Sequence, residues 1–403
     1  MDRTIVVTDG WVNSQLVPGM MRKRLQHLIK RLISETPILS SWLFPVSLVT
    51  TYAEVLKIIK FELSTEEILL DHSKILECKN CSSAKQDLRP IIDRLTDFQA
   101  FMYMTEAYYR DHILHQIRVA VLGDYLLTQI FAFPQPKSLV NLASELLDMD
   151  EEEVRRCWWI AALFHDIGMP IARLNENLEV MISDMVKAYE LDFMLPSRSI
   201  LNLQSTPKNT ELLDLILNRF SGNVKELIKN ASGLRGGSLD HGVIGALSLL
   251  ATVSRNSRST EKLYLEAAYA ICAHSLNGLS LSFEDNPLGF LLVICDEMQE
   301  WNRDVKAQEP RGFRPLAQKV RLTKSMTLTL SEIEVHGKIV FEDQKGKDRC
   351  GFQFDKLVED KRQNLARLSQ DIPGFPSFRI TLVDRVFHEN IPITEIAKEI
   401  RIT

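Results

Sequence analysis

The chain has 403 residues, of which 45% are hydrophobic and 25% are charged, a composition that excludes large-scale disorder. The formal net charge of −5 excludes a global attraction to nucleic acid, so an anionic substrate would need a local cluster of Arg and Lys. Because no secretory signal opens the sequence and no apolar run is long enough for a bilayer span, we expect a cytoplasmic protein without membrane contact.

Apolar periodicity divides the chain into three predicted parts. Residues 1–94 are predicted to be an N-terminal helical region, and residues 95–309 a helical domain that contains a helical insertion at 173–238. Residues 310–403 change to period-two alternation around one charged helix, which predicts a small α+β unit. The predicted fold class is therefore mainly α.

His165 and Asp166 directly follow the apolar run WWIAALF, which is predicted to be a buried helix. A carboxylate at the end of such a run is costly to bury unless a cation neutralises it. Imidazole nitrogen and carboxylate oxygen suit Mn²⁺, Fe²⁺, Mg²⁺ or Zn²⁺. The pair therefore indicates a metal site.

Further polar residues interrupt or border segments that otherwise resemble core: His112, His115, His241, His274 and Asp296. The first two share a helix face through their i, i+3 spacing. Each histidine alone is more often a hydrogen-bonded core residue than a ligand, and Asp296 could instead pair with Arg303 two helical turns on. Taken jointly, these residues favour a shared metal site.

The order H…HD…H…H…D resembles the HD-domain phosphohydrolase superfamily. The resemblance covers about residues 95–305 and rests on the segments HQIRV, AALFHDIG, HGVIGA and LLVICD together with His274. It implies a helical bundle around one or two divalent ions, which could be Mn, Fe, Mg or Zn. It also implies that His115, His165, Asp166 and Asp296 bind the first metal, and that Asp166 bridges to a second metal held by His241 and His274.

The resemblance further implies a metal-dependent phosphohydrolase that cleaves a phosphate ester of a nucleotide by metal-activated water. Asp166, His241 and His274 are the expected catalytic residues. Two metals would stabilise both the attacking and the leaving oxygen, whereas with one metal a free His241 or His274 could act as general acid or base. The substrate could be a cyclic nucleotide or dinucleotide, or a nucleoside phosphate.

Two departures from the family bear on the substrate. Met169 stands where the HD-GYP cyclic dinucleotide phosphodiesterases carry Lys, and their Gly-Tyr-Pro motif is absent, which disfavours cyclic di-GMP. The spacing from Asp166 to His241 is long, and if the insertion displaces His241, a one-metal deoxynucleotide triphosphohydrolase is favoured.

Basic residues near the motifs are candidates for binding the substrate phosphate: Arg118, Arg235 and Arg303. The expected partner is a nucleotide or another phosphorylated small molecule, and a homo-oligomer is possible. Two alternatives stay open. One is a catalytically inactive HD protein that serves as a nucleotide sensor or scaffold, and the other is a helical interaction protein without metal.

The six cysteines favour a reducing compartment. Cys157, Cys272 and Cys295 lie in apolar helical stretches and are predicted to be buried small hydrophobic residues. Cys78 and Cys81 have the spacing of half a zinc knuckle, but no second pair follows nearby, so a simple pair of loop cysteines is the favoured interpretation.

Overall fold

The computed structural model describes residues 3–7, 108–109, 112–132, 136–175, 203, 205–232, 239–254, 262–299, 306–307, 322–330, 334–343, 350–369, 372–373, 375–388 and 391–402. Within these residues the fold is mainly helical, as the sequence predicts. The predicted helical region 1–94 lies outside them except for Arg3–Val7, which forms strand β1. Cys78 and Cys81 also lie outside the described residues.

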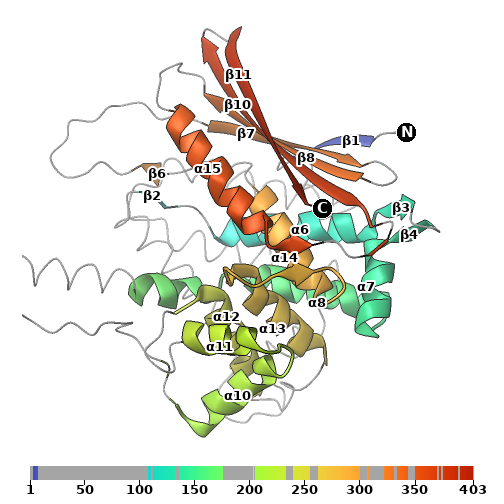
Figure 1. Cartoon of the computed structure of the whole chain (residues 1–403), viewed down its shortest axis with the longest axis vertical. Coiled ribbons are helices and arrows are strands. Elements are labelled where there is room, and N and C mark those ends of the chain that lie inside the picture. Colours follow the sequence, from blue (N-terminus) through green and yellow to red (C-terminus); the bar gives the residue numbers. More distant parts are fainter. Residues whose placement is uncertain are drawn as a thin grey trace, which may run out of the picture.

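Nine helices are present among the described residues: α6 (Ile113–Thr128), α7 (Leu139–Leu147), α8 (Glu151–Phe164), α10 (Pro207–Leu217), α11 (Asn223–Ala231), α12 (His241–Ser254), α13 (Lys262–Ser275), α14 (Pro287–Met298) and α15 (Cys350–Leu365). The helices α10 and α11 form the described part of the predicted insertion. In Figure 1 the helices from α6 to α14 form one layered body below a sheet. No helix in the described part of the chain combines the length and apolar composition that a bilayer crossing requires.

Helix α8 lies in the middle of the helical body, in contact with α6, α7 and α13. Its Trp158 is fully buried, and the indole N–H donates to the carbonyl of Ala120 on α6 at 2.8 Å. A Cβ atom at Gly123 would lie 1.8 Å from the Trp158 ring, so only glycine allows α6 to approach this side chain. Asp150 and Glu153 begin α8 with a capping box, which fixes where the helix starts.

The strands include a five-stranded sheet in the order β1-β7-β8-β10-β11. Its members are β1 (Arg3–Val7), β7 (Leu322–Leu330), β8 (Glu334–Asp343), β10 (Ser377–His388) and β11 (Ile391–Ile402). Strands β8 and β10 are parallel, and the other neighbours are antiparallel. A parallel pair needs a crossover connection, which here contains α15. The strands β1 and β11 were not among the predicted elements.

Short two-residue and three-residue strands pair elsewhere. They are β2 (Tyr108–Tyr109) with β6 (Lys306–Ala307), β3 (Ile130–Ala132) with β4 (Pro136–Ser138), and β5 (Leu281–Ser282) with β9 (Leu368–Ser369). The last of these pairs joins the helical body to the segment that follows α15.

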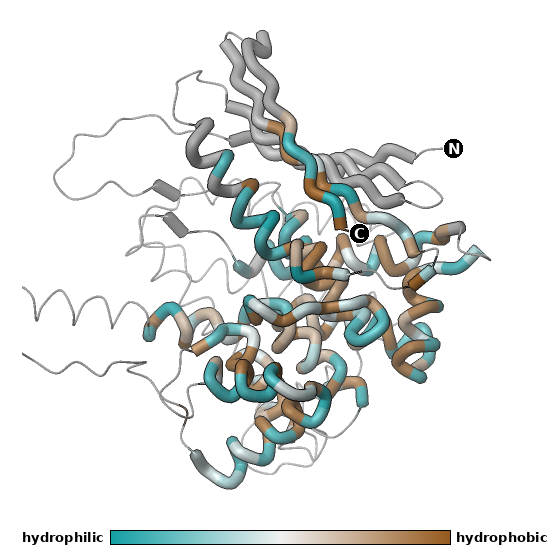
Figure 2. The backbone as a smooth tube through the Cα atoms, in the orientation of Figure 1, coloured by the Kyte–Doolittle hydropathy of each residue, from teal (hydrophilic) through white to brown (hydrophobic). Residues whose placement is uncertain are grey.

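The sheet and the helical body share one hydrophobic core. Phe283 and Phe290 of the helical body pack against Phe375 and Phe378, with ring centroids 4.7 Å apart for Phe283 and Phe375 and 6.0 Å apart for Phe290 and Phe378. Helix α15 contacts β10, β11 and α14, and Figure 1 shows it running from the sheet towards the helical body. In Figure 2 much of α15 is hydrophilic, whereas α13 and α14 carry longer hydrophobic stretches.

The three cysteines predicted to be buried are buried in the structure: Cys157, Cys272 and Cys295. Burial raises the pKa of each thiol well above its ordinary value. These side chains therefore stay uncharged and act as small hydrophobic residues.

The turn after α8 makes an unusually close contact with α12. A Cβ atom at Gly168 would lie 2.0 Å from the carbonyl oxygen of His241 and 2.7 Å from the amide nitrogen of Gly245. Because both neighbours are backbone atoms, they cannot yield as a flexible side chain would. The glycine that follows His165-Asp166-Ile167 therefore sets the distance between that turn and the first turn of α12.

We expect Gly168→Ala to destabilise the fold by about 1–3 kcal/mol, because the added methyl group overpacks this contact. Gly245→Ala is the matched control. A Cβ atom there meets a side-chain methyl of Ile271 at 3.1 Å and the backbone carbonyl of His165 at 3.4 Å, and alanine favours the helix, so a smaller loss of stability than in Gly168→Ala is expected. Urea denaturation of both variants measures the difference, and equal stability of Gly168→Ala and the wild-type chain would contradict the close contact.

Candidate metal centre

Five helices place their polar residues in one cluster, and each residue lies at a helix end. His112 directly precedes α6 and His115 lies in its first turn, while His165 and Asp166 follow the last residue of α8. The other members are His241, which begins α12, His274 in the last turn of α13 and Asp296 in the last turn of α14. All six predicted metal ligands are thus brought together from segments far apart in the sequence.

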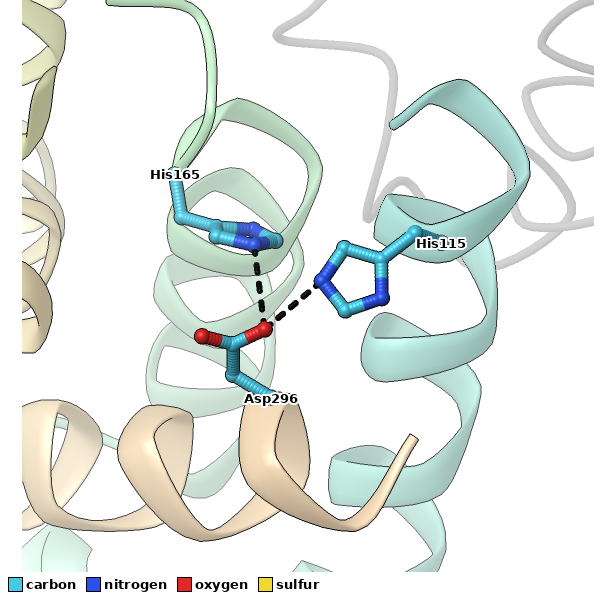
Figure 3. Close-up of side chains that lie close together, drawn as sticks. All are labelled: His115, His165 and Asp296. Atoms are coloured by element: carbon cyan, nitrogen blue, oxygen red, sulfur yellow. Dashed lines mark hydrogen bonds and ion pairs between the residues drawn. The ribbon is translucent and has the colours of Figure 1, made fainter. Parts of the chain in front are cut away.

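The first group of possible ligands is His115, His165 and Asp296, whose ligand atoms lie within 4.8 Å of one another. Asp296 Oδ1 is 2.7 Å from Nε2 of His115 and 3.9 Å from Nε2 of His165. Figure 3 shows the three side chains converging from α14, α6 and the end of α8. The predicted alternative partner of Asp296, Arg303, lies outside the described residues.

The second group is His165, Asp166 and His274, whose ligand atoms also lie within 4.8 Å of one another. Asp166 Oδ1 is 3.6 Å from Nε2 of His241 and 4.0 Å from Nε2 of His274. The long spacing between Asp166 and His241 therefore does not displace His241 from the cluster. His165 belongs to both groups, so the two groups adjoin each other.

The contact between His241 and His274 follows from how α12 begins. Asp240 Oδ1 accepts hydrogen bonds from the backbone N–H of Gly242 at 2.9 Å and of Val243 at 3.1 Å, which caps α12. The hydroxyl of Ser275 at the end of α13 donates to the same oxygen. This link holds the two helix ends side by side, with Nε2 of His241 3.1 Å from Nε2 of His274.

Backbone carbonyls fix the orientation of two of the imidazoles. Nδ1–H of His165 donates to the carbonyl of Ala162 at 2.8 Å, and Nδ1–H of His274 donates to the carbonyl of Ile271 at 2.5 Å. With the proton on Nδ1, Nε2 of each neutral ring presents a lone pair to the cluster. In His165 this buried atom has no hydrogen-bond partner among the described residues, which is the arrangement expected of a metal ligand.

The electrostatics of the cluster favour ionised carboxylates and a neutral His274. Burial alone would raise the pKa of both acids, but neighbouring imidazoles hold the pKa of Asp166 and of Asp296 well below the ordinary range. Burial, assisted by His241 and His165, lowers the pKa of His274 to about 3. At neutral pH the site therefore offers two carboxylates and at least one uncharged imidazole, which are the forms that bind a metal.

The helix ends add to the attraction for a cation. Three of the contributing helices, α8, α13 and α14, carry or adjoin their ligands at the C-terminal end. The last carbonyls of a helix give that end a partial negative charge, which favours a nearby cation. The C-terminal ends of these three helices therefore act in the same direction as the carboxylates, whereas the N-terminal ends of α6 and α12 act in the opposite direction.

Solvent reaches part of the cluster. The side chains of His241 and Asp296 are 24% and 29% exposed, whereas that of His165 is 0% exposed. His165 is therefore suited to holding an ion away from solvent, and His241 and Asp296 can contact water or a solute.

Two polar residues that were not predicted as site residues contact the cluster. Nδ1 of His112 is 3.0 Å from Oδ2 of Asp166, and Nδ1–H of His115 donates to Oε1 of Gln299 at 2.6 Å. The shared helix face of His112 and His115 was a signal for the first contact. Gln299, which directly follows α14, gave no comparable signal.

The predicted phosphate-binding residues are not brought together by the described part of the chain. Arg118 lies on α6, one turn after His115, with a buried side chain. Arg235 and Arg303 lie outside the described residues. The structure therefore does not test a shared phosphate site.

Comparison of the chain with models of protein families, with curated proteins and with solved structures finds no match. The interpretation of the cluster consequently depends on its geometry and on the motifs of the sequence.

We expect metal-free protein to bind Mn²⁺ and to gain thermal stability from it. An ion that binds only the native state stabilises it by about 2.7 kcal/mol at a hundredfold excess over Kd. Asp166→Ala should abolish this gain and leave the helix content intact. Asp214→Ala, which removes an exposed carboxylate on α10, is the control. Thermal denaturation followed by circular dichroism after chelation and refilling measures all three proteins, and an Mn²⁺-induced gain retained in Asp166→Ala would contradict the site.

His112 is expected to orient Asp166, because its ring nitrogen lies on the oxygen that faces away from His241. Loss of a group that orients a ligand typically weakens metal binding by about 10–100-fold. We therefore expect His112→Ala to raise the Kd for Mn²⁺ by that factor, as measured by titration calorimetry. His112→Asn keeps a donor near the position of Nδ1 and should retain most of the affinity. Unchanged affinity in His112→Ala would show that the contact does not support the ligand.

Proposed function

We propose that the chain is an HD-type metal-dependent phosphohydrolase that cleaves a phosphate ester of a nucleotide. The observation that carries the proposal is the convergence of six predicted ligands from five helices, with the buried Nε2 of His165 left without a hydrogen-bond partner among the described residues. Histidines and carboxylates in this mixture suit a divalent ion such as Mn²⁺ or Fe²⁺.

His115, His165, Asp166 and Asp296 would hold a first ion, and Asp166, His241 and His274 would hold a second. A bound divalent ion supplies Lewis-acid activation of water and stabilisation of the negative charge that develops at phosphorus. The distances from Asp166 Oδ1 to His241 and His274 support the two-ion arrangement, because they keep both histidines beside the acid that would bridge.

The two histidines of the second group are suited to different roles. His274 is buried, and its pKa of about 3 means that it carries no extra proton at neutral pH, so it is suited to ligation alone. His241 is partly exposed to solvent. If only one ion binds, His241 is therefore the imidazole that can contact the leaving oxygen of the substrate and serve as the general acid or base.

Residues around the cluster would hold the ligand-bearing turns in position. Gly168 lets the first turn of α12 lie against the turn that carries Asp166, and the Asp240–Ser275 contact holds that first turn beside the end of α13. Residues next to the ligands, among them Ala162, Phe164, Ala273 and Cys295, belong to the buried hydrophobic core. Rigid placement of this kind contributes to catalysis because the reacting groups need no rearrangement.

The proposal is tested with the full-length protein reconstituted with Mn²⁺, Mg²⁺ or Fe²⁺ and supplied with bis-p-nitrophenyl phosphate and a panel of nucleotides. We expect metal-dependent release of product, detected by absorbance and chromatography. Cyclic nucleotides, cyclic dinucleotides and nucleoside triphosphates in the panel distinguish a phosphodiesterase from a nucleoside phosphate hydrolase. Asp166→Ala should reduce turnover to background, and Asp214→Ala should retain it.

The outcomes separate the proposed enzyme from its alternatives. Binding of metal and nucleotide without turnover of any substrate in the panel would favour an inactive sensor or scaffold. Failure of the wild-type chain to bind any divalent ion would contradict the metal site and favour a helical interaction protein.

A further inference from the structure

Arg367 reaches from the segment after α15 to the end of α13, where it binds the backbone around His274. Its guanidinium donates to the carbonyl of Ala273 at 2.9 Å, to that of Leu276 at 2.7 Å, and to the carbonyl of His274 itself. The last carbonyls of a helix have no partner within the helix, and a cation is favourable there. Arg367 therefore completes the hydrogen bonding of the helix end that carries a candidate ligand.

The backbone of Arg367 is anchored to the same region. Its carbonyl accepts the N–H of Leu281 at 2.9 Å, and the following residue, Leu368, pairs with Leu281 in the parallel pair of β5 and β9. The segment that follows α13 is therefore bound both by the guanidinium of Arg367 and by the backbone of Arg367 and Leu368. This arrangement restricts movement of the end of α13 relative to α15.

Helix α15 also binds the end of α14, directly beside Asp296. The ammonium of Lys361 donates to the backbone carbonyl of Glu297 at 2.6 Å and lies 3.1 Å from its carboxylate, and the amide of Asn364 donates to that carboxylate at 2.7 Å. Lys361, Asn364 and Arg367 follow one another at intervals of three residues. Three polar side chains in series therefore bind the ends of two helices that carry candidate ligands.

We propose that Arg367 is a positioning residue for the candidate metal centre, which holds the end of α13 so that the imidazole of His274 stays directed at Asp166. The proposal rests on the proposed function, because it assigns a role in the same site to a residue outside the helical body. Lys361 and Asn364 act in the same way on the end of α14 and on Asp296.

The physical reason is that the guanidinium of Arg367 binds the backbone of the same residue whose side chain is the candidate ligand. Arg367 binds the carbonyl of His274, and the side chain of the same residue presents Nε2 to Asp166 Oδ1 at 4.0 Å. Nδ1 of His274 is fixed to Ile271 within the same helix, so the ring moves with the helix end. A shift of that end would therefore change the ligand geometry, to which metal affinity is sensitive.

The test compares Arg367→Ala, Arg367→Lys and the matched control Arg362→Ala in the full-length protein. Arg362 lies on the exposed side of α15, where it pairs with Glu359. Titration calorimetry gives the Kd for Mn²⁺, electron paramagnetic resonance reports the symmetry of the bound ion, and circular dichroism establishes that each variant is folded. Lys361 is not substituted, because removal of one partner from its largely buried ion pair would destabilise the fold.

We expect Arg367→Ala to raise the Kd by about tenfold, at the lower end of the effect of groups that orient ligands, and to change the resonance spectrum of Mn²⁺. Arg367→Lys keeps the positive charge but lacks the planar fork, so part of the affinity and of the spectrum should return. Arg362→Ala should match the wild-type chain in both measurements.

A wild-type Kd and spectrum in folded Arg367→Ala, or an equal loss in Arg362→Ala, would overturn the inference while leaving the proposed function intact. If Arg367→Ala does not fold, Arg367→Lys decides, and there wild-type values in both measurements would overturn it. Absence of Mn²⁺ binding by the wild-type chain would instead contradict the proposed function itself.

Discussion

The candidate metal centre depends on one electrostatic constraint, which is the burial of carboxylates among imidazoles. Asp166 and Asp296 lie beside His165, whose inward nitrogen has no hydrogen-bond partner among the described residues. Lone pairs of imidazole and carboxylate repel one another unless a proton or a cation lies between them. Burial of His274 disfavours the proton, since it lowers the pKa of this imidazole. The cost of holding these groups together explains why we favour a metal centre over a set of satisfied core histidines.

The sequence predicted the members of the cluster because each of them ends or begins an apolar run. A polar residue at the end of WWIAALF or LLVIC is visible without knowledge of the fold. The helical class and the buried cysteines were predictable from the same periodicity. The contact of His112 with Asp166 was only partly predictable, since spacing shows that His112 and His115 share a face but not which helix that face meets. Arg367 could not be found in this way, because its segment contains several charged residues and its partners are backbone carbonyls far away in the sequence.

Two glycines near the candidate ligands allow helix ends to approach one another closely. Gly168 approaches the backbone of α12, and Gly242 approaches Ser275 Oγ and the carbonyl of Ile271 on α13. Both residues adjoin candidate ligands or lie within two positions of them. The three helix ends can approach closely because these glycines have no side chain. The polar contacts of Asp240 and Ser275 then act on helices that are already near one another. The strands beyond residue 310 could be anticipated from alternation, but their pairing with β1 could not, because a short run of β-branched residues does not specify a partner.

The pairing of β1 with β7 has a consequence for how the molecule is made. Arg3 lies opposite Leu330 in the ladder, so β1 gains its partner only after the long segment between them has been synthesised. Contacts between such distant segments form slowly, because a very large loop has to close. A shortened version that stops after α14 would leave β1 unpaired and would also lack the guanidinium that binds the end of α13. Expression of the helical body alone is therefore expected to yield an aggregation-prone product, and the two ends of the chain are best kept together.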